Sequence, residues 1–152
     1  YMDQMRLESE GMRTFIIEMH NGKYNAAGLS FNYGALTYES VAEGNASVID
    51  DYLDFALERY PTLGKIYEEG YWSGTVEELM EIDRHLALKL QSNNVEYIAV
   101  TMIYGTKGDI GFIGVTYDHT DVNVSKTKQV LVKYAMKISP LLDGTQVGKK
   151  KK

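Results

Sequence analysis

Residues 95–104 (VEYIAVTMIY), 105–108 (GTKG) and 109–117 (DIGFIGVTY) decide the fold class. Both outer runs are rich in Val, Ile, Thr and Tyr, the residue types enriched in β-strands. The four residues between them make a loop of hairpin length. We therefore predict two antiparallel strands joined by a tight turn. Gly111 and Gly114 within the second run predict a bulge or the close approach of a helix.

A second strand pair is predicted near the start of the chain. In residues 12–19 (MRTFIIEM), Phe15, Ile17 and Met19 alternate onto one face. His20-Asn21-Gly22 follows, and Asn-Gly is a strong turn signal because both residues tolerate positive φ. Residues 23–34 are predicted to be an ordered loop. Residues 35–42 (ALTYESVA) are predicted to be the partner strand.

Four segments have helical signals. Residues 1–10 predict the tail of a helix that Gly11 ends, and residues 75–91 predict a helix that opens with the capping box Thr75-Val-Glu-Glu78. Two further helices are predicted over residues 47–59, closed by Pro61, and over residues 123–139, stopped by Pro140. Residues 62–74 read as a connector with one helical turn or one short strand.

The order of these elements indicates an α+β fold. Strands joined by hairpins and flanked by segregated helices favour a central antiparallel sheet, here of about five strands, with helices packed against it. We expect residues 12–19 and 110–117 to be neighbours in that sheet. A single domain is predicted over residues 1–142, followed by a disordered Lys-rich tail over residues 143–152.

Composition narrows the classes of function. The chain has 152 residues and no cysteine, which excludes disulfides, thiolate metal sites and a cysteine nucleophile. The net charge is −5, and without Lys149 to Lys152 it becomes −9, so we expect no nucleic-acid partner. No apolar run approaches 18 residues. The chain begins at Tyr1, so an upstream membrane anchor and the compartment are left open.

Catalytic motifs are missing from the sequence. His20, His85 and His119 are far apart and show no metal spacing. The chain contains no G-x-S-x-G, no phosphate-binding G-x-x-x-x-G-K-[ST] and no G-x-G-x-x-G after a strand. We therefore expect a protein that is not an enzyme and that holds no metal and no cofactor.

One acid–base arrangement is left open by the strand pairing. If the first two strands pair, Glu39 could face Glu18 or His20, and paired carboxylates are a known acid–base device. In the alternative interpretation, these are solvent-side positions of a half-exposed sheet or anchors for the 23–34 loop. We favour the structural interpretation.

The element order over most of the chain resembles a GAF-like domain, a relative of PAS domains. The resemblance implies a central antiparallel sheet with the N- and C-terminal helices on one face. It also implies helices and loops over the other face, usually covering a ligand pocket. The Asn-Lys-x-x-x-Phe-Asp-Glu motif of cyclic-nucleotide sensors is absent, so nucleotide binding is not implied.

A more specific resemblance is carried by residues 15–22 (FIIEMHNG), 28–31 (GLSF) and 37–39 (TYE). This pattern is similar to phage-encoded and bacterial proteins with an N-terminal membrane anchor and a GAF-like domain. Residues 98–104 and 110–117 also resemble the soluble domain of T-even-type phage holins. The resemblance implies a protein-docking role in timing lysis.

Two hypotheses of function follow. In the first, the chain docks a protein partner through residues 20–34; candidate contact residues are His20, Asn21, Tyr24, Phe31 and Tyr33. A homodimer is a further possibility, with no surface assigned to it. In the second, the chain is a sensor domain that binds a small-molecule ligand between the sheet and residues 47–91, in a pocket lined by Tyr38, Trp72 and Tyr97, with Glu39 as a further candidate.

Overall fold

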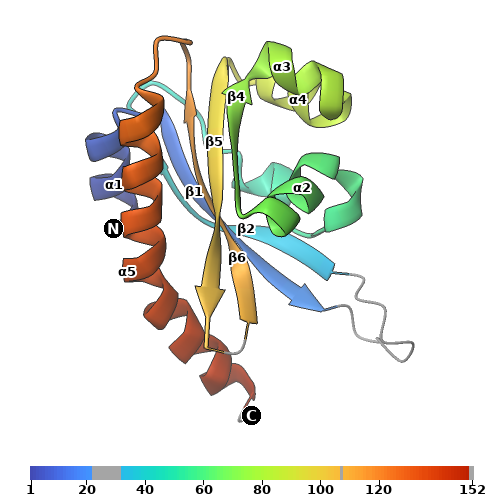
Figure 1. Cartoon of the computed structure of the whole chain (residues 1–152), viewed down its shortest axis with the longest axis vertical. Coiled ribbons are helices and arrows are strands. Elements are labelled where there is room, and N and C mark those ends of the chain that lie inside the picture. The colour runs from blue at the N-terminus through green and yellow to red at the C-terminus, as the bar shows by residue number, and fades with distance from the viewer. Residues whose placement is uncertain (22–31, 107, 151–152) are drawn as a thin grey trace.

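The computed structural model describes residues 1–21, 32–106 and 108–150, and these ranges form one antiparallel sheet with helices on both faces (Figure 1). The strand order is β3-β2-β1-β6-β5-β4. The strands are β1 (Arg13–Asn21), β2 (Asn32–Val41), β3 (Phe55–Ala56), β4 (Tyr71–Thr75), β5 (Tyr97–Gly105) and β6 (Gly108–Tyr117). The predicted α+β class and antiparallel sheet are confirmed, with six strands in place of about five.

The helices divide between the two faces of the sheet. The first and last helices, α1 (Met2–Ser9) and α5 (Val124–Lys150), pack side by side on one face (Figure 1). The other face carries η1 (Ile49–Tyr52), η2 (Leu57–Arg59), α2 (Pro61–Glu69), α3 (Val76–Ile82) and α4 (Arg84–Ser92). The sheet therefore separates two hydrophobic cores, one under each helical layer.

Alternation along the strands sends side chains to the two cores as predicted. Phe15 and Ile17 lie in the core under α2–α4, and Ile16 between them lies in the core under α1 and α5. Strand β1 pairs with β6 in antiparallel register, with Ile16 opposite Ile113. Residues 12–19 and 110–117 are therefore neighbours in the sheet, as predicted.

The glycines of β6 allow a close approach of a strand, not of a helix as one alternative proposed. A Cβ on Gly111 would lie 2.1 Å from the carbonyl oxygen of Ile17, and one on Gly114 would lie 2.4 Å from the ring of Phe15. The backbone of β1 and its side chains occupy that space. The alternative prediction of a bulge is confirmed beside Gly111: Ile103 is opposite Gly111 and Tyr104 is opposite Asp109, so Ile110 of β6 is the extra residue.

The predicted helix over residues 47–59 is wrong. The segment forms η1, β3 and η2 instead, and Pro61 begins α2 at its first turn rather than closing a helix. Proline suits this position because the first amide of a helix has no partner within the helix. The aromatic rings of Tyr52, Phe55 and Tyr60 pack against one another, with centroids 5.3–6.2 Å apart. This packing overrides the local helical pattern.

The predicted helix over residues 75–91 is two helices joined at Asp83. Its capping box is confirmed: Thr75 accepts from the Glu78 amide, and Glu78 accepts from the Thr75 amide. Asp83 follows α3 and caps α4 by accepting from the Leu86 amide at 3.1 Å. The spacing of apolar residues continues through the break at Asp83, so this spacing alone could not predict two helices.

The ends of two helices, α1 and α5, differ from prediction. Glu10, at φ 59°, ends α1 in place of Gly11. Pro140 lies inside α5, which continues to Lys150; the prediction that it stops the helix is wrong. The carbonyl that loses its partner belongs to Met136, which is exposed to solvent. The domain boundary at residue 142 stays a prediction.

Strand β1 continues through His20 and Asn21, which pair with Tyr33 and Asn32 of β2. The turn predicted at residues 20–22 therefore does not begin at His20, and the loop predicted over residues 23–34 ends before Asn32. Gly22 and the remainder of that loop, residues 23–31, lie outside the described residues.

Candidate functional site

A cavity of about 60 Å³ lies between the sheet and the helical layer, where η1, α2 and α4 contribute to its wall. Its wall is mainly apolar, and residues from four strands form the floor. The floor residues are Phe15, Ile17, Leu36, Trp72, Ile98 and Val100; the roof includes Val48, Tyr52, Phe55, Tyr60, Leu63, Ile66, Leu86 and Leu90. The cavity is thus built from the core on the α2–α4 side of the sheet.

Lys89 of α4 packs on the aromatic part of the roof. Its Nζ lies 4.5 Å from the ring centroid of Tyr52 and donates to the hydroxyl of Tyr60 at 3.0 Å. Tyr60 also stacks on the imidazole of His85, with centroids 5.7 Å apart. These contacts join η1, α2 and α4 over the cavity.

One end of the cavity wall carries a buried ion pair. Arg13 Nε lies 3.4 Å from Glu39 Oε2, and the two side chains are only 5% and 4% exposed. Arg13 Nη2 donates to the Ala46 carbonyl at 2.8 Å, and Glu39 Oε2 accepts from the Val48 amide at 2.9 Å. Burial lowers the pKa of Arg13, and Glu39 opposes that shift.

Three polar atoms of the wall have no hydrogen-bond partner in the described part of the chain: Arg13 Nε, Tyr52 Oη and Thr116 Oγ1. Arg13 and Thr116 are opposite each other in the register of β1 and β6. Burial raises the pKa of Tyr52, so its hydroxyl stays protonated at neutral pH. These polar atoms lie behind the apolar surface of the cavity and are not exposed to it.

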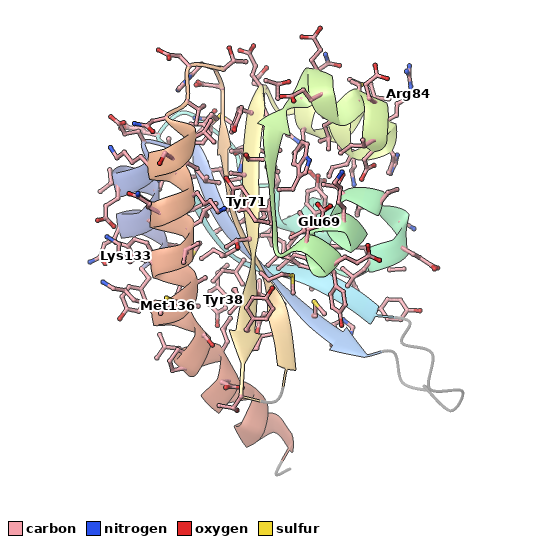
Figure 2. All side chains as sticks on the ribbon, in the orientation of Figure 1. Tyr38, Glu69, Tyr71, Arg84, Lys133 and Met136 are labelled. Carbon is pink, nitrogen blue, oxygen red and sulfur yellow. The ribbon has the colours of Figure 1, made fainter. Side chains whose placement is uncertain are left out.

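Of the residues predicted to line a pocket, Trp72 does so, while Tyr38 and Tyr97 do not. Tyr38 is paired with Ile16 and lies on the α5 side of the sheet, where it is half exposed (Figure 2). Tyr97 is buried on that same side, edge-on to Tyr117 at 6.0 Å. Their placement in the pocket was wrong because strand alternation sends both side chains to the opposite face.

The residues predicted for docking are only partly described. His20 stacks on Tyr33 with centroids 5.8 Å apart, and its Nε2 lies 3.0 Å from Asp54 Oδ1 in an exposed contact. Asn21 pairs with Asn32 in the ladder. Tyr24 and Phe31 lie outside the described residues. A role for these residues in binding stays a prediction.

The acid–base arrangement of Glu39 with Glu18 or His20 is wrong. Glu39 is opposite Phe15 and is buried on the cavity face, whereas Glu18 and His20 alternate onto the other face of β1. Glu39 binds Arg13 and the Val48 amide, so it is not a solvent-side position of the sheet. No three His, Asp or Glu residues in ranges 1–21, 32–106 and 108–150 are grouped so as to hold a metal ion.

Sequence reasoning missed Arg13, Tyr52 and Thr116. A signal for Arg13 was present, because it shares the alternation phase of Phe15 and Ile17 and therefore had to point toward a core. Tyr52 lies in the segment that was predicted to be one helix over residues 47–59, whereas it ends the short helix η1. The strands that carry Arg13 and Thr116 were predicted to be neighbours, but the register that puts these two residues opposite each other was not.

Among the parts that the structure describes, no helix is both long and apolar enough to cross a membrane. No family model matches the chain, and the search of curated proteins found no match. Similarity to known proteins therefore comes from the three-dimensional structure.

Many solved structures share the fold. The phycocyanobilin-bound GAF domain of a cyanobacterial phytochrome aligns with a TM-score of 0.74 at 12% identity, over 97% of this chain and 82% of that one. The blue-light-absorbing PixJ GAF domain of Thermosynechococcus elongatus aligns at 0.69 and 14%, over 99% and 84%. The red/green cyanobacteriochrome NpR6012g4 aligns at 0.71 and 14%, over 96% and 91%. The chain therefore has the fold of GAF domains.

Proposed function

We propose that this chain is a sensor domain that binds a small molecule non-covalently in the cavity between the sheet and α2–α4. The observation that carries the proposal is the apolar cavity itself, enclosed by Trp72, Phe55 and the other core side chains. Three similar structures, named for bound phycocyanobilin, phycoerythrobilin and biliverdin, support a ligand-binding role for a domain of this fold.

The size of the cavity limits the ligand. Sites for drug-sized molecules span about 300–1,000 Å³, whereas this one has about 60 Å³. An engineered cavity of about 150 Å³ is enough for benzene. In the described conformation the cavity therefore accepts an atom or a molecule of a few heavy atoms, and anything larger requires the roof to move.

The mode of attachment is limited too. The chain contains no cysteine, so a ligand cannot be held by a thioether bond. Binding has to come from burial of apolar surface and from hydrogen bonds. Burial contributes about 25 cal/mol for each Å² removed from water, so a ligand of this size is bound weakly unless polar contacts add to it.

Xenon is the probe for the first test, because it enters dry apolar cavities without needing a hydrogen bond. Under xenon pressure, we expect the methyl ¹³C shifts of Leu36, Ile98 and Val100 to change, since these groups line the cavity. The methyl groups of Ile113 and Leu131, in the core on the other face, are expected to stay unchanged.

A matched pair of variants locates the effect. Val100→Ile adds one methylene to the cavity wall, and Val130→Ile adds the same group to the opposite core. The first is expected to weaken xenon binding and the second to leave it unchanged. Equal shifts in both cores, or none in either, would contradict the proposed function.

Protein docking through residues 20–34 and a holin-like role are separate predictions. They depend largely on residues 22–31, which lie outside the described ranges. No observation at the exposed His20–Tyr33 stack favours a particular partner. We therefore keep the ligand-binding function as the first candidate.

A further inference from the structure

The accessible surface of the cavity is apolar throughout, even where polar residues form its wall. Several of these residues engage neighbours with their polar groups. The Tyr60 hydroxyl accepts from Lys89 at 3.0 Å, the Thr62 hydroxyl donates to Asp83 at 2.9 Å, and Asn93 Nδ2 donates to the Lys89 carbonyl at 3.1 Å. Within the described part of the chain, the cavity therefore offers a ligand no hydrogen-bonding partner.

The ion pair at one end of the wall compensates itself. Arg13 and Glu39 are 3.4 Å apart, and their remaining hydrogen bonds go to the backbone of Ala46 and Val48. A charged ligand would leave water for an apolar space in which no counter-charge is accessible to it. The cavity therefore excludes carboxylates, phosphates and ammonium ions.

Neutral polar molecules are disfavoured for a related reason. A hydroxyl, ether or carbonyl group gives up its hydrogen bonds to water on entry and receives none from the wall. Water is subject to the same limit, because a buried water molecule needs two to four polar partners. An apolar molecule therefore meets little competition from water. Of the two contributions to binding, burial of apolar surface is the one that this wall can supply.

We infer that the ligand of this cavity is an apolar molecule without hydrogen-bonding groups, such as a dissolved gas or a light hydrocarbon. This inference rests on the proposed function and specifies its ligand class. Because a cavity of about 150 Å³ holds benzene with its six heavy atoms, about 60 Å³ suits about two or three heavy atoms. The methyl groups of Leu36, Ile98 and Val100 and the indole of Trp72 would contact such a molecule.

Three probes of the same size and shape test the inference: propane, dimethyl ether and ethanol. Each is a chain of three heavy atoms, and they differ in carrying no polar atom, an acceptor or a hydroxyl. Each is titrated into the full chain, and the methyl ¹³C shifts of Ile98 and Val100 report occupancy. We expect propane to bind at least about ten-fold tighter than either oxygen compound, because the buried oxygen stays without a partner.

A matched pair of variants shows whether the wall sets this preference. Val100→Thr exchanges a methyl group of the cavity wall for a hydroxyl of similar volume, and so provides the missing partner. We expect it to reduce the preference for propane over ethanol several-fold. Val130→Thr makes the same exchange in the core on the other face and should leave the preference unchanged. The comparison of probes in the unmodified protein depends on neither variant.

Dioxygen distinguishes a dissolved gas from a hydrocarbon. Because dioxygen is paramagnetic, it speeds the relaxation of methyl groups close to it. Under dioxygen pressure, faster relaxation at Ile98 and Val100 than at Ile113 and Leu131 of the other core would identify a gas as the source. Binding of propane without that difference would identify a hydrocarbon. Both results support the inferred class.

Other outcomes separate this inference from the proposed function. Binding of dimethyl ether or ethanol as tight as that of propane would overturn the apolar-ligand inference, and so would a preference that is equal in Val100→Thr and Val130→Thr. Xenon binding would still support the cavity as a ligand site in either case. Absence of binding by xenon, propane and dioxygen would overturn both.

Discussion

Arg13 and Glu39 form an ion pair across β1 and β2, with 3.4 Å between Nε and Oε2 and almost no access to solvent. The pair does two things at once. It fixes the segment that follows β2, because Arg13 donates to Ala46 while Glu39 accepts from Val48. It also leaves Arg13 Nε without a hydrogen-bond partner beside the cavity.

Removing one partner of this pair should cost much more than removing both. Glu39→Ala leaves a buried guanidinium unpaired, and we expect a loss of about 3–5 kcal/mol in the free energy of unfolding. The double variant Arg13→Met/Glu39→Leu should recover a large part of it. Urea denaturation measures both, and a loss below about 1 kcal/mol in Glu39→Ala would show that the charge reaches water.

Asp83 is expected to be the most sensitive polar residue of the α2–α4 layer. It accepts from the amide and the hydroxyl of Thr62, at 3.1 and 2.9 Å, and from the Leu86 amide at 3.1 Å. Asp83→Ala should cost about 2–4 kcal/mol, because it removes a helix cap and leaves buried donors unsatisfied. Thr75→Ala, at the exposed cap of α3, should cost only about 1 kcal/mol. Thermal or urea unfolding measures both losses, and similar losses in the free energy of unfolding for Asp83→Ala and Thr75→Ala would contradict this ranking.

Two glycine-to-alanine changes are expected to have opposite signs. Gly111→Ala puts a methyl group 2.1 Å from the Ile17 carbonyl oxygen, so β1 and β6 must separate. We expect a loss of about 3 kcal/mol, at the upper end of overpacking effects. Gly64→Ala in α2 meets no atom within 4 Å, and it should stabilise by about 0.5–1 kcal/mol through helix propensity. Calorimetry of both variants is the measurement.

The contact between α1 and α5 has a pH dependence with a defined sign. Glu8 accepts from Lys133 Nζ at 2.7 Å, and this hydrogen bond lowers the pKa of Glu8 below 4.5, its ordinary value. A carboxyl whose pKa is lower in the folded state stabilises above its unfolded pKa and loses that stabilisation as pH falls through the folded value. Carboxyl-detected NMR should therefore give a pKa below 4.5, which Lys133→Met and high salt should raise.

Local patterns predicted the sheet well, because alternation and turn residues are local signals. Neighbouring residues alone predict which face of the sheet is occupied by Phe15, Ile16 and Ile17. They also predict the hairpin after residue 104. The pocket prediction failed where the same rule was not applied: Tyr38 has the phase of Ile16 across the ladder, and so it faces α5.

Other features depend on contacts between distant residues. Proline can close one helix or begin the next, and Pro61 begins α2 because Tyr60 packs on Tyr52 and Phe55. The break at Asp83 depends on Thr62, 21 positions earlier. The position of Arg13 opposite Thr116 depends on the register between β1 and β6, which their predicted adjacency does not fix.

Trp72 is the chain's single tryptophan, and its indole forms part of the cavity floor. The protein consequently carries a built-in fluorophore at the place where a ligand would sit. The fluorescence emission of this ring changes with the polarity and occupancy of the cavity, and no second indole contributes to the signal. Occupancy can thus be followed in unlabelled, unmodified protein at micromolar concentration.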